Sequence, residues 1–195
     1  KKITLMCLFS LMLGQEDWIE SEDRFQNDQI FYKIKALNDS LFHIINYFEN
    51  SLIASEGYLS GSTDFLNQDY WVHFYDNGKV NALGFYVDNQ KDGRWTYFYR
   101  NGQLKSEVDY IDSKRYFITA LTPDSNIQVK DGNGRLIDYY EGTKKIFEEV
   151  NYKNGRPDGV SKIYFENGQI NQKRIDRKGK IEGKLTRYYE NGQLE

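Results

Sequence analysis

The sequence predicts an all-β protein built from tandem β-hairpin repeats of about 24 residues. Asn101 follows Asn77 by 24 residues, and Asn191 follows Asn167 by the same number. In each case the Asn is followed by Gly, and an Asn-Gly pair between two β-prone stretches is a strong hairpin signal. The composition agrees, since 16 Tyr, 12 Phe and 3 Trp favour strands, while 16 Gly and 2 Pro favour many tight turns.

The chain is polar for its length. Its 195 residues have a mean hydropathy of −0.75, and 39% of them are hydrophobic. A thick globular core is not expected from such a composition. The aromatic side chains are large enough to stabilise the fold if each packs against a neighbour, as in a repeat array in which each unit contacts only the next.

Charge and cysteine content exclude several classes of protein. The 26 basic and 29 acidic residues are mixed along the chain and give a net charge of −3. No basic stripe is present, so nucleic acid is not an expected partner. Cys7 is the only cysteine, which rules out an intrachain disulfide. No segment after residue 15 is apolar enough to span a membrane.

The N-terminus resembles a secretory signal peptide. Two lysines precede a short apolar run, Ile3–Leu13, and Gly14 follows it. This order is typical of a signal peptide, so residues 1–15 are expected to be cleaved near Gln15 and the protein to be exported to the periplasm, the cell envelope or the medium. The alternative is a buried N-terminal strand or helix.

Residues 16–40 are expected to form a polar linker and the first strand. The stretch 17–28 is rich in Asp, Glu and Gln, and Trp18 and Phe25 within it are expected to dock on the first repeat. Residues 41–195 then hold about six repeats, the last of them truncated at Glu195.

Each repeat is predicted to place its Asn-Gly pair at a hairpin tip. A type I′ turn is expected there, with positive φ at both central residues. The second connection, as at residues 153–159, is expected to be longer. Four pairs mark the tips: Asn77-Gly78, Asn101-Gly102, Asn167-Gly168 and Asn191-Gly192. A further glycine stands eight residues before three of these Asn residues, as Gly93, Gly159 and Gly183. A tyrosine follows the turn in four units, as Tyr58, Tyr86, Tyr110 and Tyr152.

Alignment of the units gives columns of equivalent residues. Alternation in a strand puts Trp95, Tyr97 and Tyr99 on one face and Phe98 on the other. The Tyr99 column comprises Phe48, Tyr75, Tyr99, Tyr140, Phe165 and Tyr189. The Phe98 column comprises Tyr47, Phe74, Phe98, Tyr139, Tyr164 and Tyr188. The Trp95 column comprises Ile44, Trp71, Trp95, Leu136, Ser161 and Leu185. The Tyr97 column comprises Asn46, His73, Tyr97, Asp138, Ile163 and Arg187.

The Tyr99 and Phe98 columns are predicted to form the principal packing ladder. The Tyr97 column is expected to face solvent or lie near an edge, because buried unpaired charges at Asp138 and Arg187 would be costly.

This repeat resembles a known family. The unit Gly-x-Trp-x-x-Phe-Tyr-x-Asn-Gly-Gln-Leu at residues 93–104, followed by Tyr110, resembles the bacterial variant of the MORN repeat, found in YwqK-family antitoxins of toxin–antitoxin systems. The resemblance covers roughly residues 41–195. It implies an elongated, curled, single-layer antiparallel sheet without catalytic residues. The fifth unit departs from the pattern, with Asp176 in place of the tyrosine, and the stretch 111–138 is longer than one unit allows.

Candidate catalytic or metal-binding residues are few. His43 and His73 are the only histidines, and their separation does not suit a zinc site. Residues 131–134 are interpreted as a Gly-rich turn, since the carboxylates of a calcium loop are missing. Four carboxylates after the hairpin turns, Glu107, Asp109, Glu148 and Glu149, are interpreted as charges on the solvent face. No catalytic, cofactor-binding or metal-binding residue is therefore predicted.

Two classes of function remain. The first is a non-enzymatic scaffold that binds a protein partner, which the sequence does not identify. The alternative is a module that binds lipid headgroups or glycans of the cell envelope through exposed Tyr and Lys. Contiguous exposed aromatic side chains would favour the alternative, and mixed charges would favour a protein partner.

Overall fold

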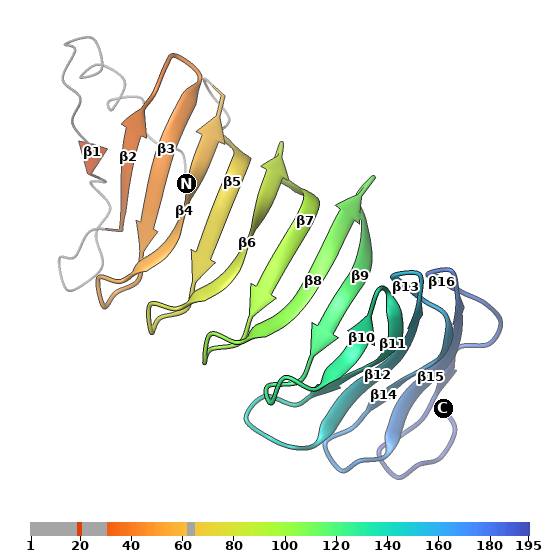
Figure 1. Ribbon diagram of the computed structural model, residues 1–195. Coiled ribbons are helices and arrows are strands. Elements are labelled where there is room, and N and C mark those ends of the chain that lie inside the picture. The colour runs from red at the N-terminus through yellow and green to blue at the C-terminus, as the bar shows by residue number, and fades with distance from the viewer. Residues whose placement is uncertain (1–18, 21–30, 62–64) are drawn as a thin grey trace. The chain divides into compact units, whose positions relative to one another are not determined.

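The computed structural model describes residues 19–20, 31–61 and 65–195. Within these residues every regular element is a β-strand, and the strand pairs are antiparallel (Figure 1). The prediction of an all-β fold of tandem antiparallel hairpins is confirmed. The predicted signal peptide, residues 1–15, lies outside the described residues, as do Cys7, Trp18 and Phe25.

The chain divides into an N-terminal unit, residues 1–102, and a C-terminal unit, residues 103–195. In the N-terminal unit the strands pair with one another in chain order. They are β1 (Ile19–Glu20), β2 (Tyr32–Ala36), β3 (Leu41–Tyr47), β4 (Ile53–Ser60), β5 (Leu66–Phe74), β6 (Val80–Val87) and β7 (Gln90–Phe98).

The C-terminal unit continues the hairpin pattern. Its strands are β8 (Leu104–Ile111), β9 (Lys114–Leu121), β10 (Ile127–Lys130), β11 (Asn133–Tyr139), β12 (Ile146–Lys153), β13 (Arg156–Pro157), β14 (Gly159–Tyr164), β15 (Ile170–Arg177), β16 (Lys180–Ile181) and β17 (Thr186–Arg187). Pairing runs in chain order from β8 to β12 and continues through β14 and β15 to β17. The short strands β13 and β16 pair with β12 and β15.

One hairpin of the array was missed by sequence analysis. Strands β9 and β10 form it, and they account for the extra length of the stretch 111–138. Its loop has the backbone bonds of the Asn-Gly loops, with the Thr122 N–H donating to Asn126 O and the Ser125 N–H to Thr122 O. Ser125 takes the positive φ that Gly takes elsewhere. The loop lacks both the aromatic pair and the Asn-Gly pair, so its sequence does not resemble that of the other hairpin tips.

The Asn-Gly pairs lie at the hairpin tips, but the predicted type I′ turn is wrong for them. In the loop 75–79 the Tyr75 N–H donates to Lys79 O at 2.8 Å, and the Gly78 N–H donates to Tyr75 O at 2.9 Å. Gly78 has a φ of 78°, whereas Asn77 keeps a negative φ. The loop therefore has five residues, and only its glycine needs the left-handed conformation.

The two-residue turns lie at the opposite ends of the strands. Asp88-Asn89, Asp112-Ser113 and Asn154-Gly155 all have positive φ at both residues, as type I′ turns require. Lys153 pairs directly with Arg156 across the last of these. The prediction of a longer second connection is thus wrong, because the tight turn consumes only two residues and, apart from Asp158, the rest of the stretch 153–159 is strand.

The buried core follows the Trp95 column rather than the predicted Tyr99 and Phe98 columns. Trp71 and Trp95 are 4% and 0% exposed, whereas Tyr99 and Phe98 are only half-buried. The reason is position along the strand. Trp95 lies in the middle of β7, but Tyr99 lies in the loop after it, and Phe98 points to the opposite face.

We call the face that carries Trp71, Ala82, Gly84 and Trp95 the packed face of the N-terminal unit. Two glycines make room for the tryptophans on it. A Cβ added at Gly57 would lie 2.2 Å from the Trp71 ring, and one at Gly84 would lie 2.4 Å from the Trp95 ring. Each indole thus lies directly on the glycine of the preceding strand. Sequence analysis did not single out either glycine.

In the C-terminal unit the core is smaller. Ala120, Val129, Val150 and Tyr152 are buried together, and Phe117 and Leu136 pack against them. The Trp95 column holds Ser161 here, which is buried and donates a hydrogen bond to the buried carboxylate of Asp176. A polar pair thus replaces the aromatic packing of the N-terminal unit.

Candidate binding surface

The repeat residues predicted from sequence are structural. Two positions of the repeat, the loop Asn and the tyrosine of the Tyr99 column, connect successive repeats. The loop Asn accepts a hydrogen bond from its own loop and donates one to the next loop along the chain. Asn77 Oδ1 accepts from the Lys79 N–H at 3.1 Å, and Asn77 Nδ2 donates to Arg100 O at 3.0 Å. Asn167 makes the same pair of contacts, with the Gln169 N–H and Glu190 O. Asparagine is required here because its side-chain amide both accepts and donates a hydrogen bond, and not because the backbone needs a positive φ.

The tyrosines of the Tyr99 column make a second connection between repeats. Tyr75 Oη donates to Phe98 O at 2.9 Å, and Tyr140 Oη donates to Tyr164 O at 2.6 Å. Phe48 and Phe165 occupy the same column without a hydroxyl, so the ring fits the position in either form. Tyr189, in the same column, has an exposed side chain.

Replacing Tyr75 with phenylalanine is therefore expected to cost about 1 kcal/mol, because the ring stays and one hydrogen bond is lost. Urea unfolding followed by far-UV circular dichroism would measure the change. Tyr139→Phe is the matched control, since Tyr139 is exposed and should tolerate the change. Equal losses for the two variants would contradict a role for the Tyr75 hydroxyl.

The remaining predicted glycines serve the backbone. Gly93, Gly159 and Gly183 have φ of 61°, 114° and 83°, a region that L side chains rarely adopt. Gly102, Gly168 and Gly192 take the same role in their loops as Gly78. Of the predicted tyrosines, Tyr152 is buried and Tyr110 is half-buried.

His73 does not behave as the solvated residue that its column predicted. Its ring stacks between those of Trp71 and Trp95, with centroids at 5.9 and 6.0 Å. Its Nε2 is buried and has no hydrogen-bond partner among the described residues. Burial lowers the pKa of His73, and the positive charge of Lys91 lowers it further. The ammonium of Lys91 lies 4.1 Å from the centroid of the Trp95 ring.

The neutral form of His73 is thus favoured in the folded state. A histidine whose pKa is lowered on folding contributes stability at pH values above its unfolded-state pKa of about 6.5. This stability is lost as the pH falls through the folded-state pKa. We expect His73→Phe to remove part of the acid sensitivity of the N-terminal unit. Urea midpoints at pH 7.5 and pH 5 would show a smaller drop in the variant. An unchanged drop would contradict this account.

The four carboxylates interpreted as solvent-facing charges differ in environment. Glu149 is buried, against the prediction, because the Arg135 guanidinium and the Tyr164 hydroxyl cover both its oxygens. Burial alone would raise the pKa of Glu149, but these two hydrogen bonds lower it. Glu148 points to the other face of β12, where burial raises its pKa. Glu107 and Asp109 are half-buried on β8.

Each unit leaves one face of its sheet more open to solvent. In the N-terminal unit this open face carries Tyr70, Phe85 and Val87, which are 38%, 47% and 46% exposed. Tyr70 and Phe85 pair across β5 and β6 with their ring centroids 5.1 Å apart, edge to face. Phe85 also pairs with Asp92 on β7, so the exposed rings lie beside a charge.

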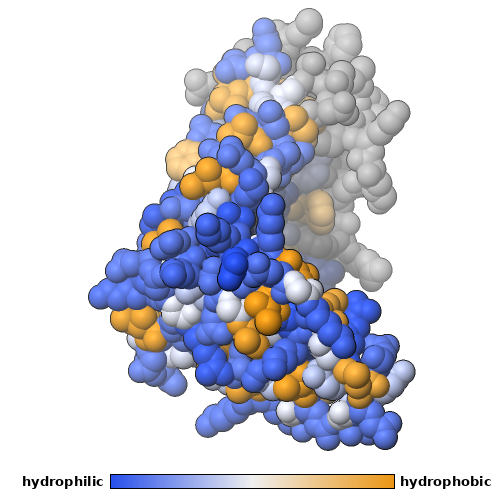
Figure 2. Space-filling view, turned by 90° about the vertical axis from the view of Figure 1, so that its right-hand side faces the viewer, coloured by the Kyte–Doolittle hydropathy of each residue, from blue (hydrophilic) through white to orange (hydrophobic). Residues whose placement is uncertain are grey.

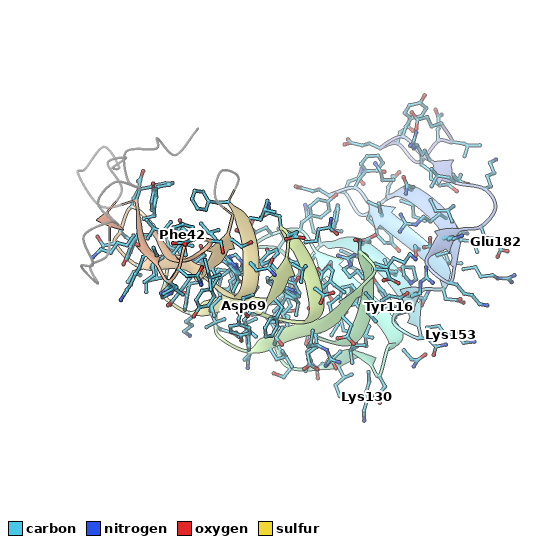
Figure 3. All side chains as sticks on the ribbon, turned by 90° about the horizontal axis from the view of Figure 1, so that it is seen from above. Phe42, Asp69, Tyr116, Lys130, Lys153 and Glu182 are labelled. Carbon is cyan, nitrogen blue, oxygen red and sulfur yellow. The ribbon has the colours of Figure 1, made fainter. Side chains whose placement is uncertain are left out.

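The open face of the C-terminal unit holds a groove across β11, β12, β14 and β15. It is lined by Arg135, Glu149, Asn151, Val160, Lys162 and Lys173. Glu149, Lys162 and Lys173 are direct neighbours across the strands. Side chains project from both faces of the sheet (Figure 3). The groove could not be predicted from the sequence, because its residues come together only through the register of four separate strands.

The polar surface is mixed. Figure 2 shows one side of the molecule, on which hydrophobic residues form small patches surrounded by hydrophilic ones.

The part of the chain that the structure describes contains no group of three or more His, Cys, Asp or Glu side chains that could hold a metal ion. The same residues include no helix with the length and apolar character needed to cross a membrane.

Comparison with known families identifies the repeat. The family model of the MORN repeat variant matches four stretches, residues 70–88, 91–112, 157–175 and 181–195. The match covers stretches in both units, and the MORN-repeat part of the resemblance is confirmed. No curated protein matches the sequence.

Proposed function

We propose that the chain is a non-enzymatic repeat scaffold that binds a protein partner through the open faces of its sheets. One observation carries the proposal. The packed face is filled by the chain's own side chains, whereas the opposite face leaves apolar groups exposed among charges. Protein interfaces combine apolar anchors, especially aromatic ones, with a polar surround.

Tyr70 and Phe85 are the anchors that this proposal assigns to the N-terminal unit. Both rings are exposed, they support each other edge to face, and the neighbouring strands supply polar groups such as Glu56 and Thr96. A partner that covered this pair would remove apolar surface from water and gain the directional contacts of the two rings.

The finer points of the proposal concern partner and location. The resemblance to YwqK-family antitoxins supports a toxin protein as the partner. The lysine-led apolar run at residues 1–15 supports export, which would put the partner in the envelope or outside the cell. Cell fractionation of the full chain and of a chain without residues 1–15 shows whether the protein is exported and therefore where its partner must lie. Retention of both in the cytoplasm would contradict export.

Affinity capture with the chain from residue 16 onward tests the scaffold proposal. Tyr70→Ser with Phe85→Ser is the test variant. Ile127→Ser is the matched control, since Ile127 is an exposed apolar residue on β10 in the other unit. A protein captured by the wild type and the control, and lost by the double variant, would support the proposal. Capture that is indifferent to Tyr70 and Phe85 would contradict their role as anchors.

The second candidate function is binding to lipid headgroups or glycans of the envelope. The exposed Tyr70–Phe85 pair also favours this function, because sugar rings and interfacial lipids pack on aromatic faces. Sedimentation with vesicles or with purified cell-wall glycan tests it directly. Binding that depends on Tyr70 and Phe85 in these assays, with no protein captured, would replace the scaffold proposal by this one.

A further inference from the structure

The groove of the C-terminal unit carries an excess of positive charge. Arg135, Lys162 and Lys173 contribute three positive charges and Glu149 one negative charge, which leaves a net +2. The Glu149 carboxylate is already bound by Arg135 and by Tyr164. Neither lysine has a carboxylate within ion-pair distance in the portion of the chain that the structure describes.

The two lysines repel each other in the free protein, and Glu149, the other cross-strand neighbour of Lys162, offsets only part of this repulsion. Lys162 and Lys173 are direct cross-strand partners on β14 and β15. Like charges directly opposite each other destabilise an antiparallel pair. An anion held between the two ammonium groups would remove this repulsion, so the free energy of binding would include its relief.

Apolar side chains lie beside the charged pair. Val160 and Ile175 are also direct cross-strand partners, and they are 37% and 48% exposed. Each stands two residues from a lysine on its own strand, so both pairs lie on the same face. Two residues of a strand span about 6.8 Å. The lysine pair and the Val160–Ile175 pair therefore lie side by side on this face. The distance between them equals the distance between alternate residues of an extended chain.

We infer that this groove binds an extended acidic segment of a protein partner, with a carboxylate over Lys162 and Lys173 and an apolar side chain, two residues away, over Val160 and Ile175. The inference rests on the proposed scaffold function and names the chemistry of the partner. A peptide lying along the strands has the same two-residue period as the groove, so both side chains are seated without bending the backbone. A free phosphate or a lipid headgroup would use the lysines but not the apolar pair.

The probe is the synthetic peptide acetyl-Thr-Glu-Thr-Leu-Thr-Glu-Thr-amide with a fluorescent label, titrated with the chain from residue 16 onward at low salt. We expect saturable binding that weakens as salt is added. Lys162→Gln with Lys173→Gln should reduce the affinity by about five-fold or more, since each exposed ion pair contributes up to about 1 kcal/mol. A peptide with Ser in place of Leu should also bind more weakly.

Lys130→Gln is the matched control, because Lys130 is an exposed lysine on β10, outside the groove (Figure 3). It should leave the affinity unchanged. Thermal unfolding guards against loss of fold, since the double glutamine variant removes both the Lys162–Lys173 repulsion and the attraction of Lys162 to Glu149 and should stay folded. A peptide affinity that is equal in the wild type, the double variant and the control would overturn the inference.

Two further arms separate the other sources of negative charge. Inorganic phosphate and vesicles of phosphatidylglycerol are titrated in place of the peptide. Lysine-dependent binding to either of them, without binding of the peptide, would overturn the acidic-segment inference in favour of a phosphate ligand. Failure of the peptide alongside protein capture that depends on Tyr70 and Phe85 would remove this inference and leave the scaffold proposal standing.

Discussion

Replacing Trp95 with alanine should destabilise the N-terminal unit by about 3–5 kcal/mol, the usual range for removing a fully buried aromatic side chain. The indole has no exposed surface, its Nε1 donates to Phe85 O at 2.9 Å, and its ring contacts those of His73, Tyr86 and Tyr97. Alanine would leave a cavity on Gly84 and would remove the contact with the Lys91 ammonium.

Urea unfolding with far-UV circular dichroism would measure this loss, and Tyr99→Ala is the comparison. Tyr99 is half-buried and lies in the loop after β7, so its truncation should cost less than that of Trp95. A larger loss for Tyr99→Ala would restore the Tyr99 column as the principal ladder and contradict the burial seen in the structure.

Gly84→Ala should cost about 3 kcal/mol, although alanine usually suits a strand at least as well as glycine. Gly84 does not have a positive φ, so its backbone suits any residue, and the cost is steric. The added Cβ would lie 2.4 Å from one ring atom of Trp95 and 2.5 Å from the next, so the buried indole would have to move.

A double-mutant cycle identifies the cause. In the Trp95→Ala background the Gly84→Ala change should cost little, because the ring that it meets is gone. Gly93→Ala is the control for backbone conformation, since its φ is 61° and its Cβ would meet no atom within 4 Å. The Gly93 cost should stay the same in both backgrounds. Additive costs for Gly84 and Trp95 would contradict the direct contact.

Sequence patterns predicted the hairpins well where the turn chemistry is local. The four Asn-Gly tips and the positive-φ glycines follow from backbone conformations that few other residues adopt. The type of turn was predicted wrongly, because Asn77 is selected by its contact with the next loop and not by its own φ. A contact 23 residues away leaves no signal within one repeat.

The packing could not be predicted from columns alone. Tyr99 and Trp95 share a face and both are aromatic, so residue type does not distinguish a mid-strand position from a loop position. Gly57 and Gly84 carry no turn signal, and their role depends on a ring from the following strand. The hairpin of β9 and β10 was missed because Thr122–Asn126 reproduces the loop with different residues.

The groove on the C-terminal unit, like the packing, could not be predicted from the sequence. Glu149, Lys162 and Lys173 are separated by 13 and 11 positions, and only the register of β12, β14 and β15 makes them neighbours. Of these residues only Glu149 was interpreted from the sequence, as a charge on the solvent face, and neither lysine was singled out. Their arrangement as a cross-strand lysine pair beside exposed Val160 and Ile175 becomes apparent only in the folded chain.

Hydrogen exchange on the Trp95→Ala variant tests most directly the claim that this is an array of hairpins held by neighbour contacts. Each hairpin depends on the next, so amides of β5, β6 and β7 should lose protection while those of β14 and β15 keep it. Loss of protection to the same extent in β5–β7 and in β14–β15 would mean that the chain unfolds as one cooperative core, and the account of a repeat array would be wrong.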